Sequence, residues 1–119
     1  MEITTRTQNG VTLVVVAGSL DSNTSPQAQQ ALDGMLAAGV RKMALDCTAL
    51  DYISSAGLRV LLGTAKRLSG AGGAGGAGIG GGTLRLFGLN ETVREVFDIS
   101  GFSTILAVFA TEAAALKGF

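Results

Sequence analysis

Two short apolar segments joined by a helical one constrain this chain more than any other feature. Residues 11–17 are nearly all β-branched or apolar, which is typical of a strand covered on both faces, and residues 43–47 form a second apolar strand. The segment between them places apolar side chains along one face of a helix and ends at Gly39. Strand, helix and strand in this order predict parallel strands joined by a right-handed crossover. The apolar helix residues are Ala28, Ala31, Leu32, Met35 and Leu36.

The first helix has two possible starts. Thr24 as N-cap, with Gln27 three residues later, would form a capping box. Ser25 as N-cap, with Pro26 at the first helical position, fits equally well. Both arrangements place the helix directly after a polar loop at residues 18–25 that leads out of the strand.

The other elements extend this unit into a mixed sheet. Residues 1–7 alternate as a half-buried strand does, and Asn9-Gly10 predicts a type I′ hairpin turn. This first strand should therefore pair antiparallel with residues 11–17. We expect further strands at 83–88 and 104–109, and helices from about 55 to 69, at 91–99 and at 112–117.

The segment 51–62 passes directly from a polar loop into an amphipathic helix. Ser54 and Ser55 precede apolar residues with helical spacing, so one of the two serines is predicted to be the N-cap. The helix dipole and free N–H groups also favour an added phosphate at such a position. Taken locally, capping alone accounts for both serines. The apolar positions are Leu58, Leu61, Leu62, Ala65 and Leu68.

Composition excludes several classes of function. Nine basic residues balance nine acidic ones without a basic run, so nucleic acid and anionic membranes are poor partners. The absence of histidine removes the usual general base and the commonest metal ligand, and the single cysteine, Cys47, excludes an intrachain disulfide. The apolar runs are far shorter than the ~20 residues of a membrane helix, and residues 1–6 do not form a signal peptide. We therefore expect one cytoplasmic domain.

No group of side chains predicts an enzyme, a metal centre or a cofactor. A nucleophilic Ser55 would need Lys42 or Lys66 beside it as base, and no spacing in the chain provides this. An acidic cluster ahead of Ser54 lacks a third ligand and is weak evidence for a cation. That cluster consists of Asp46 and Asp51, with Tyr52.

A glycine-rich tract at residues 70–82 interrupts the pattern. It holds nine of the chain's eighteen glycines, a composition that buries too little surface to offset the entropy of ordering it, so we expect a flexible loop. The tract contains a nominal G-x-G-x-x-G at residues 73–78. It follows a helix and precedes a strand, the reverse of the order that aims helix N–H groups at a phosphate, and we do not interpret it as a phosphate site.

Four segments of the chain together resemble a known family. Residues 53–58, of sequence ISSAGL, and residues 18–24, of sequence GSLDSNT, are similar to the two signature segments of the anti-sigma factor antagonists of the STAS domain family. Residues 84–86 and 93–102 resemble the family's penultimate strand and following helix. The resemblance implies a single α/β domain over residues 1–119, with a mostly parallel sheet of about five strands and about four helices. The glycine tract departs from the shorter turn that the family uses there.

The resemblance also assigns roles to residues. Ser55 aligns with the family's phosphorylatable serine, and Ser54 with a position often occupied by aspartate. Asp21 and Thr24 match the acidic and hydroxyl positions of a loop beside the phosphosite. Asp21 would orient the Ser55 hydroxyl, bind the kinase, or simply close its own loop as an Asx turn. The expected partner-binding set is Asp21, Thr24, Ser54, Ser55, Gly57, Leu58 and Arg59.

The function implied by the resemblance is partner switching. The unphosphorylated protein would bind an anti-sigma factor that is itself a serine kinase, and so free a sigma factor for transcription. The kinase would then phosphorylate Ser55 with ATP, and a protein phosphatase would reset the cycle. The alternative is a non-switching STAS subunit of a lipid-transport or stressosome-type assembly.

Overall fold

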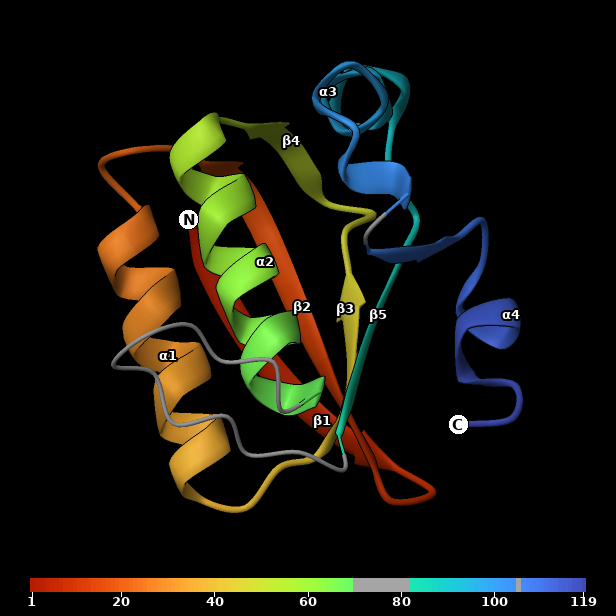
Figure 1. The fold of residues 1–119 in the computed structure, drawn as a ribbon. Coiled ribbons are helices and arrows are strands. Elements are labelled where there is room, and N and C mark those ends of the chain that lie inside the picture. The colour runs from red at the N-terminus through yellow and green to blue at the C-terminus, as the bar shows by residue number, and fades with distance from the viewer. Residues whose placement is uncertain (70–81, 105) are drawn as a thin grey trace.

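The computed structural model describes residues 1–69, 82–104 and 106–119. The loop predicted at residues 70–82 lies outside these residues except for Gly82. The described elements alternate between strands and helices along the chain (Figure 1). In order they are β1 (Glu2–Gln8), β2 (Val11–Leu20), α1 (Ser25–Ala37), β3 (Lys42–Asp46), β4 (Leu50–Ile53), α2 (Ser55–Ser69), β5 (Thr83–Phe87), α3 (Glu91–Ser100), a 3₁₀ turn (Phe102–Thr104), β6 (Ala107–Phe109) and α4 (Glu112–Leu116).

The sheet is mixed and mostly parallel, as predicted. Five of its strands lie side by side in the order β1-β2-β3-β5-β6. Strand β4 is not in this row and pairs with β2. Of the described strand pairs, only β1 and β2 are antiparallel, and their hairpin has positive φ angles of 52° at Asn9 and 80° at Gly10. A type I′ turn requires positive φ at both central residues, so the predicted turn is confirmed.

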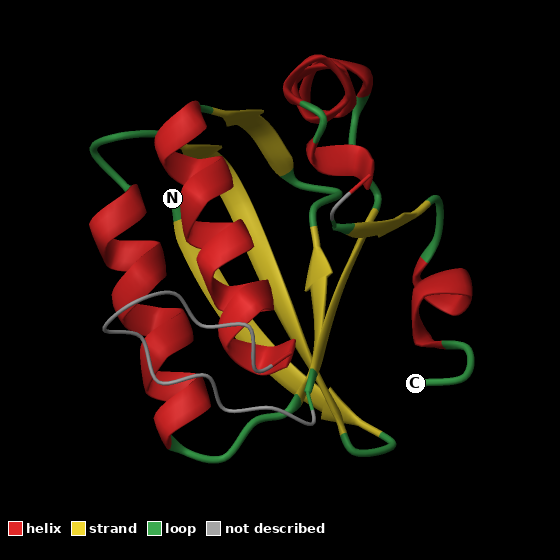
Figure 2. Cartoon of the chain, viewed as in Figure 1, coloured by secondary structure: helices red, strands yellow, loops and turns green. Residues whose placement is uncertain are grey.

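Helices cover both faces of the sheet (Figure 2). Helices α1 and α2 lie on one face, over a cluster that includes Val14, Leu45 and Leu86. Helix α4 lies on the other face, over the smaller cluster of Leu13, Phe87 and Ala115. Strand residues alternate between the two clusters because successive side chains point to opposite faces. None of the helices among the described residues has the length and apolarity that crossing a membrane requires.

The strands differ from the sequence prediction in extent and number. Strand β2 continues to Leu20 instead of ending at residue 17, and β4 makes six strands instead of about five. After β3 the chain turns back to β2, where the Gly18 amide donates to the Ala49 carbonyl at 2.9 Å. The register shifts between Gly18 and Ser19, which marks a β-bulge. This pairing joins segments about thirty positions apart, so local sequence patterns do not reveal it.

Thr24 occupies the N-cap position of α1, as one of the two predicted starts has it, but the predicted capping box does not form and Ser25 is not the cap. The Thr24 side chain accepts no capping bond from the helix; its hydroxyl instead donates to the Ser19 carbonyl at 2.8 Å. Ser25 lies inside the helix and its hydroxyl donates to the Asp21 carbonyl. Gly39, with φ of 99°, ends the helix in the predicted C′ position. The loop before α1 therefore uses these hydroxyls to hold its own shape.

Candidate functional site

Ser54 and Ser55 occupy different environments at the start of α2. The Ser54 hydroxyl accepts from the Gly57 amide at 3.4 Å, and the Ser54 carbonyl accepts from the Leu58 amide at 2.9 Å. Ser54 is therefore the N-cap, which resolves the choice that the sequence left open. Ser55 is the first helical residue and is exposed, and its hydroxyl bonds to none of the described residues. The hydroxyl of Ser55 is thus accessible and has no part in holding the described helix.

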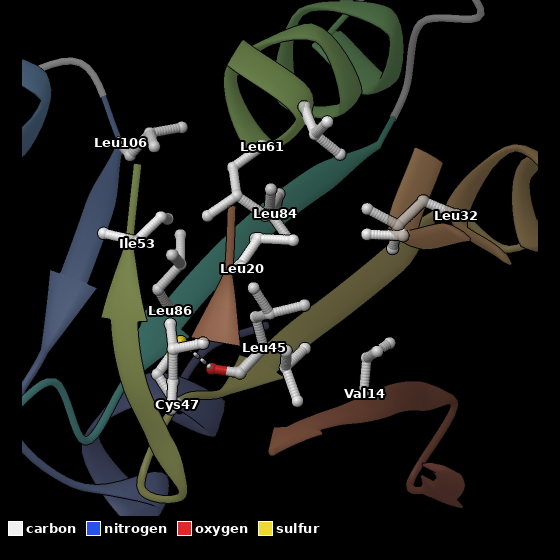
Figure 3. Close-up of a cluster of buried hydrophobic side chains, with 14 of the residues drawn as sticks. Val14, Leu20, Leu32, Leu45, Cys47, Ile53, Leu61, Leu84, Leu86 and Leu106 are labelled. Carbon is white, nitrogen blue, oxygen red and sulfur yellow. Dashed lines mark hydrogen bonds between the residues drawn. The ribbon is translucent and has the colours of Figure 1, made fainter. Parts of the chain in front are cut away.

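The end of β2 fixes the position of this helix start. The Ser54 amide donates to the Leu20 carbonyl at 2.9 Å. A Cβ atom on Gly57 would lie 2.8 Å from the Leu20 carbonyl oxygen and 2.9 Å from Cγ1 of Ile53. Only a glycine allows this approach without a shift of the neighbouring backbone. The side chains of Leu20 and Ile53 point into the core, where Leu61 of α2 also packs (Figure 3).

Asp21 closes the loop that follows Leu20. Its Oδ1 atom accepts from the Asn23 amide at 2.9 Å and from the Thr24 amide at 3.1 Å. Hydrogen bonds from the backbone N–H groups of Thr24 and Asn23 lower the pKa of the Asp21 carboxyl. Among the described residues no hydrogen bond joins Asp21 to Ser55. The carboxylate holds its own loop as an Asx turn, and the residue is only partly buried.

Some of the predicted partner-binding residues are buried or hold the backbone, and others are exposed. Gly57 and Leu58 are buried, with Leu58 only 3% exposed, so both lie beneath the surface. Thr24 and Ser54 are half-buried and hold the backbone through hydrogen bonds. Ser55 and Arg59 are exposed, one helical turn apart. Of the predicted set, Ser55 and Arg59 are therefore accessible from solvent, and Asp21 is partly accessible.

Two residues that were not among the predicted site residues belong to β4 or contact it, and β4 is the strand that leads into Ser54. Asn90 caps α3 by accepting from the Val93 amide at 2.8 Å, and its side-chain amide also donates to the Leu50 carbonyl at 3.0 Å. It thereby ties α3 to β4. Tyr52 of β4 is 46% exposed, so its ring is available at the surface. An asparagine directly before a helical pattern signals an N-cap, but the bond to Leu50 depends on the tertiary fold.

Asp46 of the acidic cluster holds its own turn, and Cys47 is buried in the core. Asp46 accepts from the Thr48 amide at 3.0 Å and from the Thr48 hydroxyl at 2.7 Å, within its own turn. No group of three or more metal-ligating side chains occurs among the described residues. Burial, together with the nearby charge of Asp46, raises the pKa of the Cys47 thiol to about 12. A thiol that stays protonated is a poor nucleophile, so Cys47 serves as a core residue.

The comparison with protein families agrees with the four sequence segments. The model described as "STAS domain" matches residues 2–115 of the chain. This chain belongs to the STAS domain family. BtrV of Bordetella bronchiseptica, a candidate anti-sigma factor antagonist, is 37% identical over 119 residues. The match covers 100% of this chain and 95% of BtrV. The family prediction is therefore confirmed.

Solved structures of STAS proteins share the fold. A candidate anti-sigma factor antagonist of Thermotoga maritima, known from its crystal structure, superimposes with a TM-score of 0.83 at 20% identity, over 97% of this chain and 92% of its own. SpoIIAA of Bacillus matches in its unphosphorylated form with a TM-score of 0.74 at 20% identity, over 97% of this chain and 93% of that one. Its phosphorylated form matches with a TM-score of 0.67, over 97% and 96%. At these identities the likeness confirms the predicted STAS fold.

Proposed function

We propose that this protein is a cytoplasmic anti-sigma factor antagonist that works by partner switching, with Ser55 as the phosphorylated residue. One observation carries the proposal: Ser55 is exposed and unbonded within the described structure, while its neighbour Ser54 caps the helix. A change of charge at Ser55 therefore leaves the bonds that hold α2 in place. The full-length similarity to BtrV supports the same role.

The covalent step is a phosphoryl transfer. An anti-sigma factor with serine kinase activity would transfer the γ-phosphoryl group of ATP to the Ser55 oxygen, and the hydroxyl proton would pass to a base of the kinase and from there to water. The bond between the γ-phosphorus and the oxygen that bridges to the β-phosphate breaks, and ADP leaves. A protein phosphatase would hydrolyse the phosphate ester with water and return the serine and inorganic phosphate.

The consequence for binding is electrostatic. A phosphate brings about −1.5 to −2 charges to the exposed start of α2, where the helix dipole tolerates them. The backbone stays in place, so release of the partner follows from repulsion and from the cost of desolvating the phosphate in an interface. SpoIIAA, which shares the fold, has been solved in both unphosphorylated and phosphorylated forms.

Co-expression with a candidate anti-sigma kinase, followed by mass-spectrometric mapping, tests the phosphosite. We expect phosphate on Ser55, none on the Ser55→Ala variant, and retention of phosphate on Ser55 in a Ser54→Ala control. Ser55→Ala should keep binding the anti-sigma factor, and Ser55→Asp should bind poorly. Equal binding by these two variants would show that the interface does not include this helix start. A complete absence of phosphate with cognate kinases would instead favour the non-switching subunit.

A further inference from the structure

Arg59 differs from the other arginines of this chain. The sequence has six arginines, and five of them contact partners in the structure. Arg59 forms neither an ion pair nor a hydrogen bond with any residue that the structure describes, and its side chain is exposed. The partners of the other five are Glu112 for Arg6, Asp33 for Arg67, Asp98 for Arg94, backbone carbonyls for Arg41, and backbone carbonyls with two aromatic rings for Arg85.

The geometry of α2 places this exposed guanidinium beside Ser55. Arg59 follows Ser55 by four residues in one continuous helix. Side chains four residues apart lie on the same face of a helix, with Cβ atoms about 5–6 Å apart. Between them, Gly57 and Leu58 are buried, whereas Ser55 and Arg59 are both exposed, so these two side chains share the solvent-facing stripe of the helix start. An acidic group that precedes a basic one by four residues is also the more favourable orientation.

We infer that Arg59 is the intramolecular partner of a phosphate on Ser55, and that the unphosphorylated protein offers Arg59 to an acidic group of the anti-sigma factor. This inference rests on the proposed function. A guanidinium binds a phosphate through paired, charge-assisted hydrogen bonds, which are stronger than those between neutral groups. Phosphorylation would thus act twice at the same surface. It adds negative charge that repels the partner's carboxylate, and it withdraws the arginine that this carboxylate contacts.

Two acidic side chains near the start of α2 would shift the second pKa of the phosphate in the opposite direction from Arg59. Asp21 lies on the loop that follows β2, and Asp51 lies on β4, three residues before the helix cap. Both are acidic and would raise the second pKa of a phosphate by repulsion. Neither changes between variants at position 59. A comparison of such variants therefore isolates the contribution of Arg59.

The second ionisation of the phosphate, followed by ³¹P NMR, tests the pair without any kinase or partner. Phosphoserine can be introduced at position 55 of the full chain by genetic encoding. An Arg59→Gln variant of that protein removes the guanidinium, and Arg94→Gln removes an exposed arginine from α3 as a matched control. Circular dichroism checks that each protein is folded.

We expect the second pKa of the phosphate, ordinarily about 6, to be about 0.3 lower in the protein that keeps Arg59 than in the Arg59→Gln variant. Arg94→Gln should leave it unchanged, and high salt should reduce the difference because it screens exposed charges. Identical titrations for native and Arg59→Gln proteins, or equal shifts in both variants, would overturn the inference. If the phosphorylated chain fails to fold, the carboxyl introduced by Ser55→Asp can be titrated with and without Arg59 under the same criteria.

The outcome is distinguishable from a failure of the proposed function. Phosphoserine is introduced here without a kinase, so the titration reports only whether Arg59 pairs with the phosphate. If the phosphate pKa does not respond to Arg59→Gln but a kinase phosphorylates Ser55, the pairing of Arg59 with the phosphate is refuted and the proposed partner switching stands. Absence of kinase-dependent phosphorylation would refute the switch whatever the titration shows.

Discussion

The amide of Ser54 donates to the carbonyl oxygen of Leu20 at 2.9 Å, and this bond joins the end of β2 to the start of α2. Gly57 packs against the same carbonyl, because a Cβ atom there would lie 2.8 Å from its oxygen. The loop with Asp21 and the helix start with Ser55 therefore meet at one corner that is hydrogen-bonded and closely packed. Mutations that open this corner should affect both segments together.

Gly57→Ala should destabilise the protein by about 1–3 kcal/mol, because the added methyl group overpacks the contact with Leu20 and Ile53. Gly63→Ala, on the same helix, is the matched control, since a Cβ atom there meets nothing within 4 Å. That control should stabilise by about 0.5–1 kcal/mol, as alanine does in a helix interior. Urea unfolding measures both changes. A stabilising Gly57→Ala variant would contradict the close packing.

Ser54→Ala and Ser55→Ala should differ in their effects on folding. Ser54→Ala removes the N-cap and should cost about 0.5–2 kcal/mol of stability. Ser55→Ala removes an exposed hydroxyl without a described partner and should change stability by less than about 0.5 kcal/mol. Thermal or urea unfolding of the two variants decides this. Equal losses of stability would mean that both hydroxyls hold the helix.

Asp21 should make the stability of the folded protein depend on pH in the acid range. Its folded-state pKa lies below the ordinary value of 3.8, so the unfolded chain takes up a proton more readily. The contribution is complete above pH 3.8 and is lost as the pH falls below it, through the lower folded-state pKa. Asp21→Asn should therefore flatten the decline of stability in this range. Unfolding free energies between about pH 2.5 and pH 7 test it, with Asp51→Asn, which alters an exposed carboxylate on β4, as the control.

Cys47 should resist thiol reagents as long as the protein is folded. Its side chain is fully buried, and burial raises its pKa to about 12, so at about pH 8 the thiol stays protonated and out of reach. Reaction with a disulfide reagent at this pH should follow the unfolded fraction as urea is added. Rapid labelling without urea would show that the β3 end opens in the native state.

Local sequence patterns predicted most of the elements of this fold. The type I′ turn at Asn9-Gly10, the end of α1 at Gly39 and the start of α2 beside two serines all follow from φ preferences, capping and apolar spacing, which act within a few residues. The family resemblance pointed to Ser55 for the same reason, since its motif is contiguous. Properties that depend on neighbours in sequence were thus accessible from the sequence alone.

The tertiary structure decided what depends on distant neighbours. Strand β4 exists because residues 50–53 pair with the end of β2, and the two serines differ because Ser54 is bonded to the backbone of α2 and β2 while Ser55 faces outward. Burial of Leu58, and the lack of a partner for Arg59 among the described residues, are likewise results of packing. By itself, the sequence determined the family and the order of elements, because local preferences and motifs are short-range. Which side chains are exposed at the candidate site was decided only by long-range contacts, which no local pattern encodes.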